Sequence, residues 1–151
     1  SRLNFKGGRA MFIKQISVFV ENKSGRLAEI TAILAKANID IRALSVADTT
    51  HFGILRLIVN RPDAAEEALR NSGLTVSLTN VIAISVPDHP GGFAQAAQAL
   101  RDVDIEYMYA FISRDQGRAC VILRVPDNEA ALEALKAGGI EILKDSDIYS
   151  M

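Results

Sequence analysis

Residues 15–27 read QISVFVENKSGRL, and residues 81–93 read VIAISVPDHPGGF. In each stretch apolar residues alternate with others, and this period of two predicts a β-strand. Turn-forming residues and a glycine follow, and an amphipathic helix is expected to begin directly after them. When Gln15 is aligned with Val81, the two glycines at positions 25 and 91 also coincide. The chain therefore carries two copies of one strand–loop–helix unit.

The similarity extends well beyond these two stretches. In the same alignment, Leu34 corresponds to Leu100 and Leu57 to Leu123. A unit of this length is longer than most solenoid repeats, so we expect each copy to be a small domain with its own core. Such a domain is only marginally stable alone. The copies are therefore expected to pack against each other, against a second chain, or both.

Both copies show the same order of elements, βαββαβ. The first copy predicts elements at residues 16–20, 26–37, 39–47, 52–59, from 62 to a cap at Gly73, and 74–78. The second predicts them at residues 81–86, 92–101, 105–113, 118–125, 128–137 and 140–143. This order indicates the α+β class, with two tandem ferredoxin-like units. Because only Thr79 and Asn80 join the copies, the two sheets are expected to lie side by side in one larger antiparallel sheet.

The composition limits the cellular setting and the partners. We expect a leader or disordered start at residues 1–10, a first domain at 11–79 and a second at 80–151. The 17 Lys and Arg nearly balance the 18 Asp and Glu, which gives no electrostatic reason to expect a nucleic acid or a membrane surface as partner. No signal peptide is evident, and no apolar run approaches the roughly 20 residues of a spanning helix. A cytoplasmic protein is therefore expected.

The loop between the first strand and the first helix of each copy is the candidate binding segment. Glycine at positions 25 and 91 allows a close approach of the backbone, and the helix that follows directs free N–H groups toward the loop. Such a helix start suits a carboxylate. Asn22 and Asp88 occupy equivalent positions and are able to accept hydrogen bonds from an ammonium group. This combination matches a free α-amino acid, although ordinary loop and N-cap chemistry uses the same residue types.

A second polar position follows the first helix of each copy. It is Asn38 in the first copy and Asp104 in the second, and the spacing from Asn22 to Asn38 equals that from Asp88 to Asp104. The polar pair is thus repeated with a change of charge, and two facing carboxylates favour a cation between them. Asn and Asp are also common at helix ends for structural reasons, so this second coincidence supports a ligand site without deciding it.

These loops, the turns at 37–41 and 103–106, and the element order resemble the ACT domain. The resemblance covers nearly the whole chain from Met11 onward, as two tandem copies. It implies a small-molecule regulatory module that senses amino acids, with the effector at an interface where the first loop of one domain faces the helix-one turn of its neighbour. The chain is therefore expected to signal to a metabolic enzyme rather than to act as one.

Carried over by position, the resemblance implies two ligand sites. The first would use Asn22, Gly25, Arg26, Leu27, Asn38 and Ile39, and the second Asp88, Gly91, Gly92, Phe93, Asp104 and Ile105. The second copy has Gly92 and Phe93 where a larger residue and leucine are common in the family. The two sites are therefore expected to differ in selectivity, or one of them is expected to be vestigial.

Other functional classes find less support. Tyr107, Tyr109 and Phe111 share one face of a predicted strand, as the base-stacking residues of RNA-binding modules do, but the near-neutral charge argues against RNA. We favour a sheet face covered by a second chain, which predicts a homodimer or a larger oligomer. His51 and His89 have no companion at metal-ligand spacing, so no metal is expected, although His89 adjoins the second loop.

No nucleophile elbow, P-loop or dinucleotide fingerprint is present, so neither catalysis nor a cofactor is expected. Two alternatives remain open. Ile39–Ala47 also resembles the start of the regulatory subunit of acetolactate synthase, and a structural oligomerisation module without a ligand would use the same fold.

Overall fold

The computed structural model describes residues 12–21, 23–48, 51–111 and 117–150. The chain divides into two compact units, residues 14–79 with 149–151 and residues 1–13 with 80–148. We call these units the first half and the second half. The expected leader at residues 1–10 lies outside the described residues, and the expected domain bounds of 11–79 and 80–151 stay a prediction.

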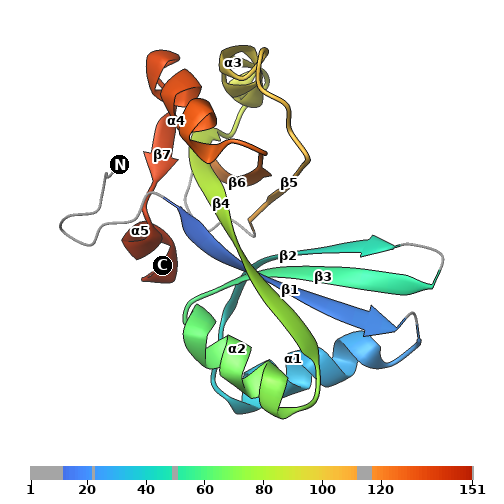
Figure 1. Cartoon of the computed structure of the whole chain (residues 1–151). Helices are drawn as coiled ribbons and strands as arrows, with labels where there is room; N and C mark the ends of the chain where they lie inside the picture. The colour runs from blue at the N-terminus through green and yellow to red at the C-terminus, as the bar shows by residue number, and fades with distance from the viewer. Residues whose placement is uncertain (1–11, 22, 49–50, 112–116, 151) are drawn as a thin grey trace. The chain divides into compact units, whose positions relative to one another are not determined.

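The first half contains the predicted βαββαβ order (Figure 1). Its elements are β1 (Ile13–Glu21), α1 (Arg26–Lys36), β2 (Ile41–Asp48), β3 (Phe52–Val59), α2 (Pro62–Asn71) and the first part of β4 (Thr75–Pro87). Proline stands at the start of α2, where its missing N–H has no helical partner to lose. Strands β1 and β2 both pair antiparallel with β3.

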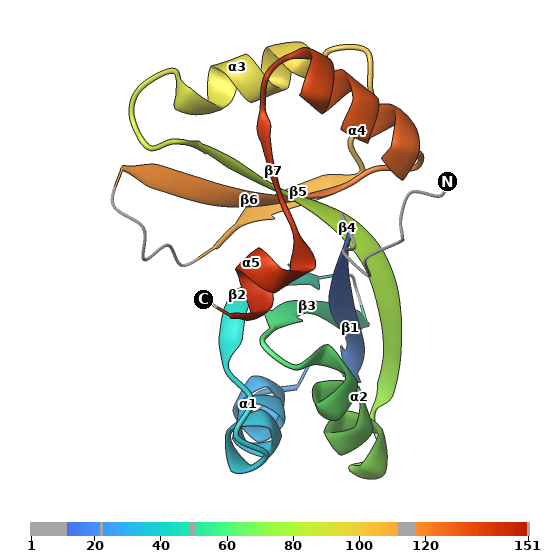
Figure 2. The same cartoon turned by 90° about the vertical axis from the view of Figure 1, so that its left-hand side faces the viewer.

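The second half repeats this order (Figure 2). Its elements are the last part of β4, α3 (Gly92–Ala99), β5 (Tyr107–Ala110), β6 (Arg118–Arg124), α4 (Asn128–Ala137), β7 (Glu141–Leu143) and the short α5 (Asp145–Tyr149). The Asp127 carboxylate caps α4 by accepting a hydrogen bond from the Ala130 N–H at 3.1 Å. Strands β6 and β7 pair antiparallel with β4, and β5 pairs antiparallel with β6.

The spatial order of strands is the same in both halves. It runs β2-β3-β1-β4 in the first half and β5-β6-β4-β7 in the second. In each case the two central strands are the first and third of the unit, and the two helices pack together. This is the ferredoxin-like arrangement that the sequence predicted, and the α+β class is confirmed.

The core of each half explains the repeat in the sequence. Residues of the first core include Ile16, Val18, Ile30, Leu34, Leu55, Leu57, Val59, Ala65 and Leu69. The residues at the aligned positions of the second copy, which are Ile82, Ile84, Ala96, Leu100, Val121, Leu123, Val125, Ala131 and Leu135, belong to the second core. What the duplication preserved is therefore the set of positions that pack a helix pair against a sheet.

The structure differs from the expected elements in three places. The two strands expected at 74–78 and 81–86 form the single strand β4, and Thr79 and Asn80 do not interrupt it. Strand β5 covers only residues 107–110 of the expected 105–113, part of which lies outside the described residues. The helix α5 was not expected, and five residues are too few for a periodic signal.

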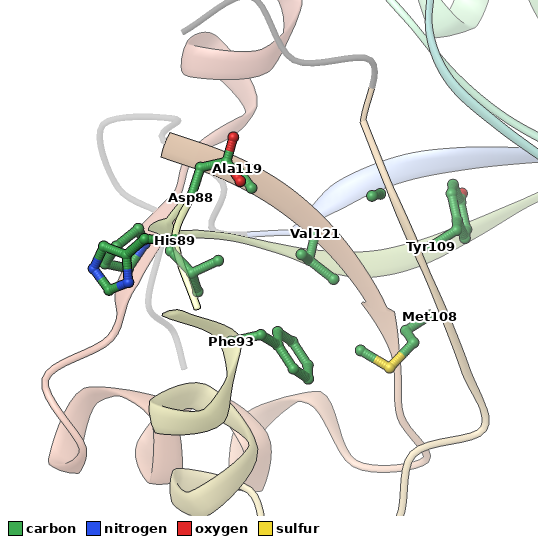
Figure 3. Close-up of a pocket in the computed structure, with 10 residues that line it drawn as sticks. Asp88, His89, Phe93, Met108, Tyr109, Ala119 and Val121 are labelled. Carbon is green, nitrogen blue, oxygen red and sulfur yellow. The ribbon is translucent and has the colours of Figure 1, made fainter. Parts of the chain in front are cut away.

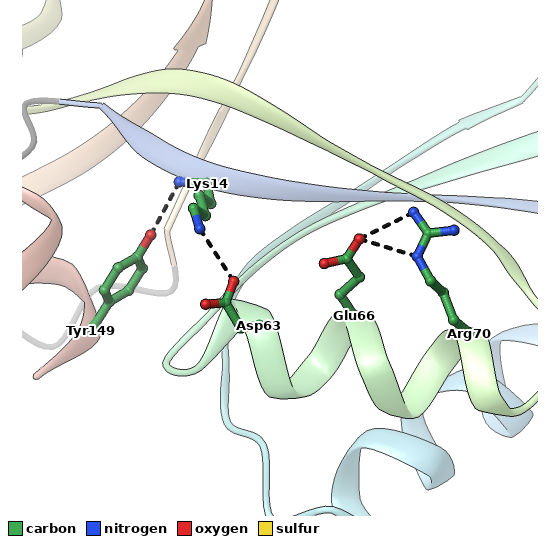
Figure 4. A network of polar contacts seen from close by, with 5 residues as sticks. All are labelled: Lys14, Asp63, Glu66, Arg70 and Tyr149. Carbon is green, nitrogen blue, oxygen red and sulfur yellow. Dashed lines mark hydrogen bonds and ion pairs between the residues drawn. The ribbon is translucent and has the colours of Figure 1, made fainter.

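Polar contacts connect β1, α2 and the chain end within the first half (Figure 4). The Lys14 backbone N–H donates to the Tyr149 hydroxyl at 3.1 Å, and the Lys14 ammonium lies 3.2 Å from the Asp63 carboxylate. One turn further along α2, Arg70 and Glu66 form an ion pair at 3.1 Å. Among the described residues, no helix has the length and apolar character needed to cross a membrane.

Candidate functional site

In the second half, the start of α3 packs directly against the end of β4. Gly91 adopts a left-handed conformation with φ of 85°, which L-residues with a Cβ rarely adopt. Gly92 is buried, and a Cβ on it would lie 1.9 Å from the carbonyl oxygen of Pro87. The Gly92 N–H donates to the His89 carbonyl at 2.9 Å. Only glycine fits at position 92 without moving the loop.

This loop, β5 and β6 surround a cavity of about 350 Å³ (Figure 3). The cavity is lined by Val86, Pro87, Asp88, His89, Phe93, Met108, Tyr109, Ala110, Ala119 and Val121. Figure 3 shows the Phe93 ring and the Met108 side chain directed toward each other across the space, with Val121 above them in this view. Such a volume lies near the lower end of the range found for small-molecule sites.

Strand register explains why the inner wall of the cavity is apolar. Met108 pairs with Leu123, and Ala110 pairs with Val121. Residues paired in an antiparallel sheet point to the same face, and Leu123 and Val121 belong to the core beneath the helices. Met108 and Ala110 therefore lie on the helix-covered face, as the predicted alternation of this strand requires.

Apart from Tyr109 on β5, the polar side chains that line the cavity lie on the loop. Asp88 and His89 are both exposed, and the Asp88 backbone N–H donates to the Gly117 carbonyl at 2.9 Å. The His89 Nδ1 lies 3.0 Å from the Pro90 carbonyl oxygen. Of the ten described residues that line the cavity, Asp88 has the one carboxylate, and none is Lys or Arg. The cavity thus joins an apolar interior to an anionic rim.

The corresponding loop of the first half carries charged side chains instead. Gly25 has the same left-handed conformation, with φ of 90°. The Arg26 guanidinium donates to Glu21 and to Glu29, each at 2.8 Å, and Lys23 lies 3.3 Å from Glu21. The hydrogen bond from Arg26, followed by that from Lys23, holds the pKa of Glu21 below its ordinary value, and the same pairing with Glu21 raises the pKa of Arg26.

Asn38 ends α1 through its backbone. Its φ of 60° is left-handed, its N–H donates to the Ala35 carbonyl, and the Ile39 N–H donates to the Leu34 carbonyl. This pair of bonds is a Schellman motif, in which Asn38 stands where glycine is usual. Arg61 donates to the Asn38 carbonyl at 2.6 Å. The residue that the sequence singled out for its side chain thus has a backbone role in the first half.

The predicted site residues fall into separate groups. Asp88 and Phe93 line the cavity, and Gly91 and Gly92 shape its loop. Gly25, Arg26 and Leu27 occupy the start of α1, whereas Asn22 lies outside the described residues.

Within one half, the helix separates each loop from its turn. The 11 residues of α1 span roughly 16 Å at about 1.5 Å each, and Asn38 and Ile39 lie beyond its far end. Asp104 and Ile105 likewise follow α3 and do not line the cavity. That a loop and a turn meet across two domains stays a prediction.

The sequence did not identify Met108, Ala110, Ala119 and Val121 as site residues. One cause is that the alignment of the two copies changes at β5. The repeat that aligns Leu57 with Leu123 also aligns Leu44 with Ala110. In the sheets, however, Leu44 pairs with Leu57 as Met108 pairs with Leu123. The structural counterpart of Leu44 is therefore Met108, which precedes Ala110 on the same face of β5.

The same change of alignment alters the end of the first helix. Ile39 is 7% exposed and belongs to the first core. Its expected counterpart Ile105 is 37% exposed, and Val103 packs on the second core instead. The apolar alternation of β5 was the available signal for the cavity wall, but strand register is needed to place it.

The first half has a second hollow, of about 470 Å³, between α1 and the turn that leads into β4. It is lined by Arg26, Glu29, Ile30, Ala32, Ile33, Ser72 and Leu74. None of these, apart from Arg26, was predicted to bind a ligand. Among the described residues, no group of three or more His, Cys, Asp or Glu side chains is placed to hold a metal ion.

Comparison with known proteins identifies a family and several related structures. The family described as "ACT domain pair" matches residues 11–151. Protein BT0572 from Bacteroides thetaiotaomicron is 42% identical, and the match covers 94% of this chain and 99% of that one with a TM-score of 0.87. No curated protein matches the sequence.

Two more distant structures share the fold. The regulatory subunit of aspartate kinase from Thermus thermophilus is 20% identical, with 87% of this chain and 95% of that one covered and a TM-score of 0.62. The corresponding subunit from Thermus flavus is also 20% identical, with coverage of 83% and 92% and a TM-score of 0.54.

Proposed function

Since the chain belongs to the family of ACT domain pairs, we propose that it is a non-catalytic regulatory protein that binds a free amino acid or a similar small metabolite. The family is a small-molecule regulatory module, and binding is proposed to be reported to a metabolic enzyme. In this account the protein supplies a binding equilibrium, and no bond of the ligand is made or broken.

The observation that supports this proposal most is the cavity of about 350 Å³ in the second half. It opens beside the strand–helix loop that was predicted from the sequence to bind a ligand. Its volume suits one small molecule, and its rim offers Asp88 as an acceptor for an ammonium group. A loop that served only as scaffold would need neither feature.

Regulation would follow from differential affinity. The cavity is bounded by a loop, a helix start and the edge strand β5, which pairs on one side with β6. A ligand that contacts all three stabilises the arrangement that holds them together, to the extent that it binds that arrangement better than others. A site shared between two domains, as the family resemblance implies, remains part of this proposal.

A thermal-shift screen against the twenty amino acids at millimolar concentration tests the proposal. A ligand at 100 times its dissociation constant stabilises the folded state by about 2.7 kcal/mol, so a selective rise of the melting temperature is expected. If no amino acid raises it, and calorimetry shows no heat of binding either, a structural oligomerisation module becomes the better account.

We also propose that the protein is a cytoplasmic homodimer or a larger oligomer. The support is the exposure of large apolar side chains, since Phe19, Val46 and Phe52 are 56%, 57% and 59% exposed. Sedimentation at micromolar concentration is expected to give at least twice the chain mass. A monomer at that concentration would contradict this part of the proposal.

A further inference from the structure

We propose that the second-half cavity selects ligands with an apolar side chain, so that the effector is an aliphatic, thioether or aromatic amino acid whose ammonium group is bound by Asp88. This inference rests on the proposed function, because it names the ligand class of the same site. It is carried by the lining of the cavity, by the charge at its rim and by the way its loop is built.

The inner wall of the cavity is mostly apolar. Three of its ten described lining residues have polar side chains, and two of these, Asp88 and His89, lie on the loop. The third, Tyr109, alternates with Met108 and Ala110 along β5 and so belongs to the other face of that strand. Phe93, Met108 and Val121 face the space from α3, β5 and β6 (Figure 3), and Ala119 and Val86 complete the wall. A polar or charged ligand side chain placed there would lose its hydrogen bonds to water without replacement. An apolar one would remove its own surface and that of the wall from water.

The charge of the described rim residues disfavours strongly anionic ligands. A nucleotide or a sugar phosphate needs Lys, Arg or several backbone N–H groups to balance its charge, and among the described residues the ten that line the cavity include no Lys or Arg. Asp88 is an anion, so it favours a ligand with a cationic group near the loop. A free amino acid meets this condition, because its ammonium group lies next to the carbon that carries its side chain.

The loop geometry places no charged side chain at the first position of the helix beside the cavity. Gly92 occupies the first position of α3 and has no side chain, and the backbone of Pro87 lies against it. At the matched position of the first half, Arg26 lies between Glu21 and Glu29. The second-half loop is therefore held by backbone packing, which leaves Phe93 as the first side chain of the helix at the cavity.

Isothermal titration of the full chain with single amino acids tests the ligand class. L-leucine, L-methionine and L-phenylalanine are expected to bind at least tenfold more tightly than L-serine, L-aspartate and L-lysine. Binding of a polar or charged amino acid as tightly as the best apolar one would overturn the inference while leaving the proposed function intact. Absence of binding by all twenty would overturn both.

A matched pair of variants tests the location. Met108→Gln keeps the length of the side chain but makes the cavity wall polar, and it is expected to weaken binding of the best apolar amino acid by roughly tenfold. Leu44→Gln is the control, because Leu44 has the same strand register in the first half and does not line this cavity. It is expected to change the affinity by less than about twofold.

Ala110→Leu provides a second test that removes no contact, since it fills the cavity from β5 and is expected to weaken binding as well. Retention of wild-type affinity by both Met108→Gln and Ala110→Leu would overturn the inference.

The role of Asp88 is tested with two ligands that differ by one group. Asp88→Asn is expected to weaken binding of L-leucine roughly tenfold and to leave binding of 4-methylpentanoate, which lacks the ammonium group, unchanged or stronger. Equal weakening for both ligands would mean that Asp88 acts only through the shape of the loop, and would overturn its assignment as the ammonium acceptor.

Discussion

In both halves, the last residue of a strand contacts the first residue of the next helix. The two residues stand at matched positions of the repeat, but the interaction between them differs. In the first half, the Glu21 carboxylate accepts a hydrogen bond from the Arg26 guanidinium at 2.8 Å. In the second half the matched residues are Pro87 and Gly92, and their backbones approach so closely that a Cβ on Gly92 would lie 1.9 Å from the Pro87 oxygen. The duplicated loop thus kept its geometry and exchanged an exposed ion pair for close packing.

The interaction that holds each loop also determines which side chains surround the start of the helix. An exposed ion pair contributes little to stability and surrounds the helix start with charge. Close packing of backbone on backbone requires Gly92, which adds no side chain where the helix begins beside the cavity. The second half therefore has the apolar cavity, and the first half has a charged loop. The predictions that follow test this contrast, from the largest expected effect to the smallest.

Substitution of Gly92 is expected to have the largest effect on stability. Gly92→Ala places a methyl group against the Pro87 carbonyl, and the strain is expected to lower the free energy of unfolding by about 3 kcal/mol. Urea denaturation followed by circular dichroism measures the change. Arg26→Ala at the matched position is the control and should leave the unfolding midpoint nearly unchanged. Equal losses of unfolding free energy in the two variants would contradict the proposed difference between the two loops.

The two left-handed glycines should behave alike, because the halves share this part of the loop. A Cβ at Gly25 or Gly91 meets nothing within 4 Å, so the penalty is conformational only. Gly25→Ala and Gly91→Ala are each expected to lose about 1–2 kcal/mol of unfolding free energy. A loss at one position alone would show that the two loops differ in backbone conformation as well as in side chains.

Asn38 provides a test of backbone role against ligand role. Its φ of 60° in the Schellman motif suits glycine better than any other residue. Asn38→Gly is expected to preserve or slightly raise stability, whereas Asn38→Ala should lose about 1 kcal/mol. Thermal unfolding without ligand measures both variants. Loss of amino-acid binding in the stable Asn38→Gly protein would instead show that the side chain serves the site.

The ion pair of the first half predicts the smallest effect, a change in titration. Because Arg26 and Lys23 lower the pKa of Glu21 in the folded protein from its ordinary value of 4.5, the stabilisation is fully present above that value. It is lost as the pH falls through the lowered pKa. Arg26→Gln is expected to raise the pKa of Glu21 toward 4.5, measured by the carboxyl chemical shift in NMR. An unchanged titration would mean that Arg26 does not pair with Glu21 in solution.

The cores were predictable from the sequence because the physical requirement is repetitive. A helix pair packed on an antiparallel sheet needs apolar residues at fixed spacings, and positions such as Leu34 and Leu100 satisfy it in both copies. The glycines in the loops before α1 and α3 were recognisable for the same reason, although their left-handed conformation was seen only in the structure. Such features depend on residues that are close in the sequence, so a sequence pattern reveals them.

The cavity was not predictable to the same extent, because it depends on register and on close contact between distant segments. Phe93 and Met108 both line the cavity, and the pairing of β5 with β6 places Met108 two residues away from the position that the repeat predicts. The need for glycine at position 92 arises from Pro87, and no periodic pattern reveals that contact. Asn38 has a backbone role that its residue type did not predict, and the ligand contact that its residue type suggested stays a prediction.

The central claim is that an apolar amino acid binds in the second half between the loop, α3 and β5. Methyl and aromatic NMR spectra of the full chain, recorded during titration with L-leucine, test it most directly. The account predicts shift changes that saturate at Phe93, Met108, Ala119 and Val121, while Leu27 and Leu44 of the first half change little. Saturating changes at Leu27 and Leu44, with the cavity residues unaffected, would contradict it.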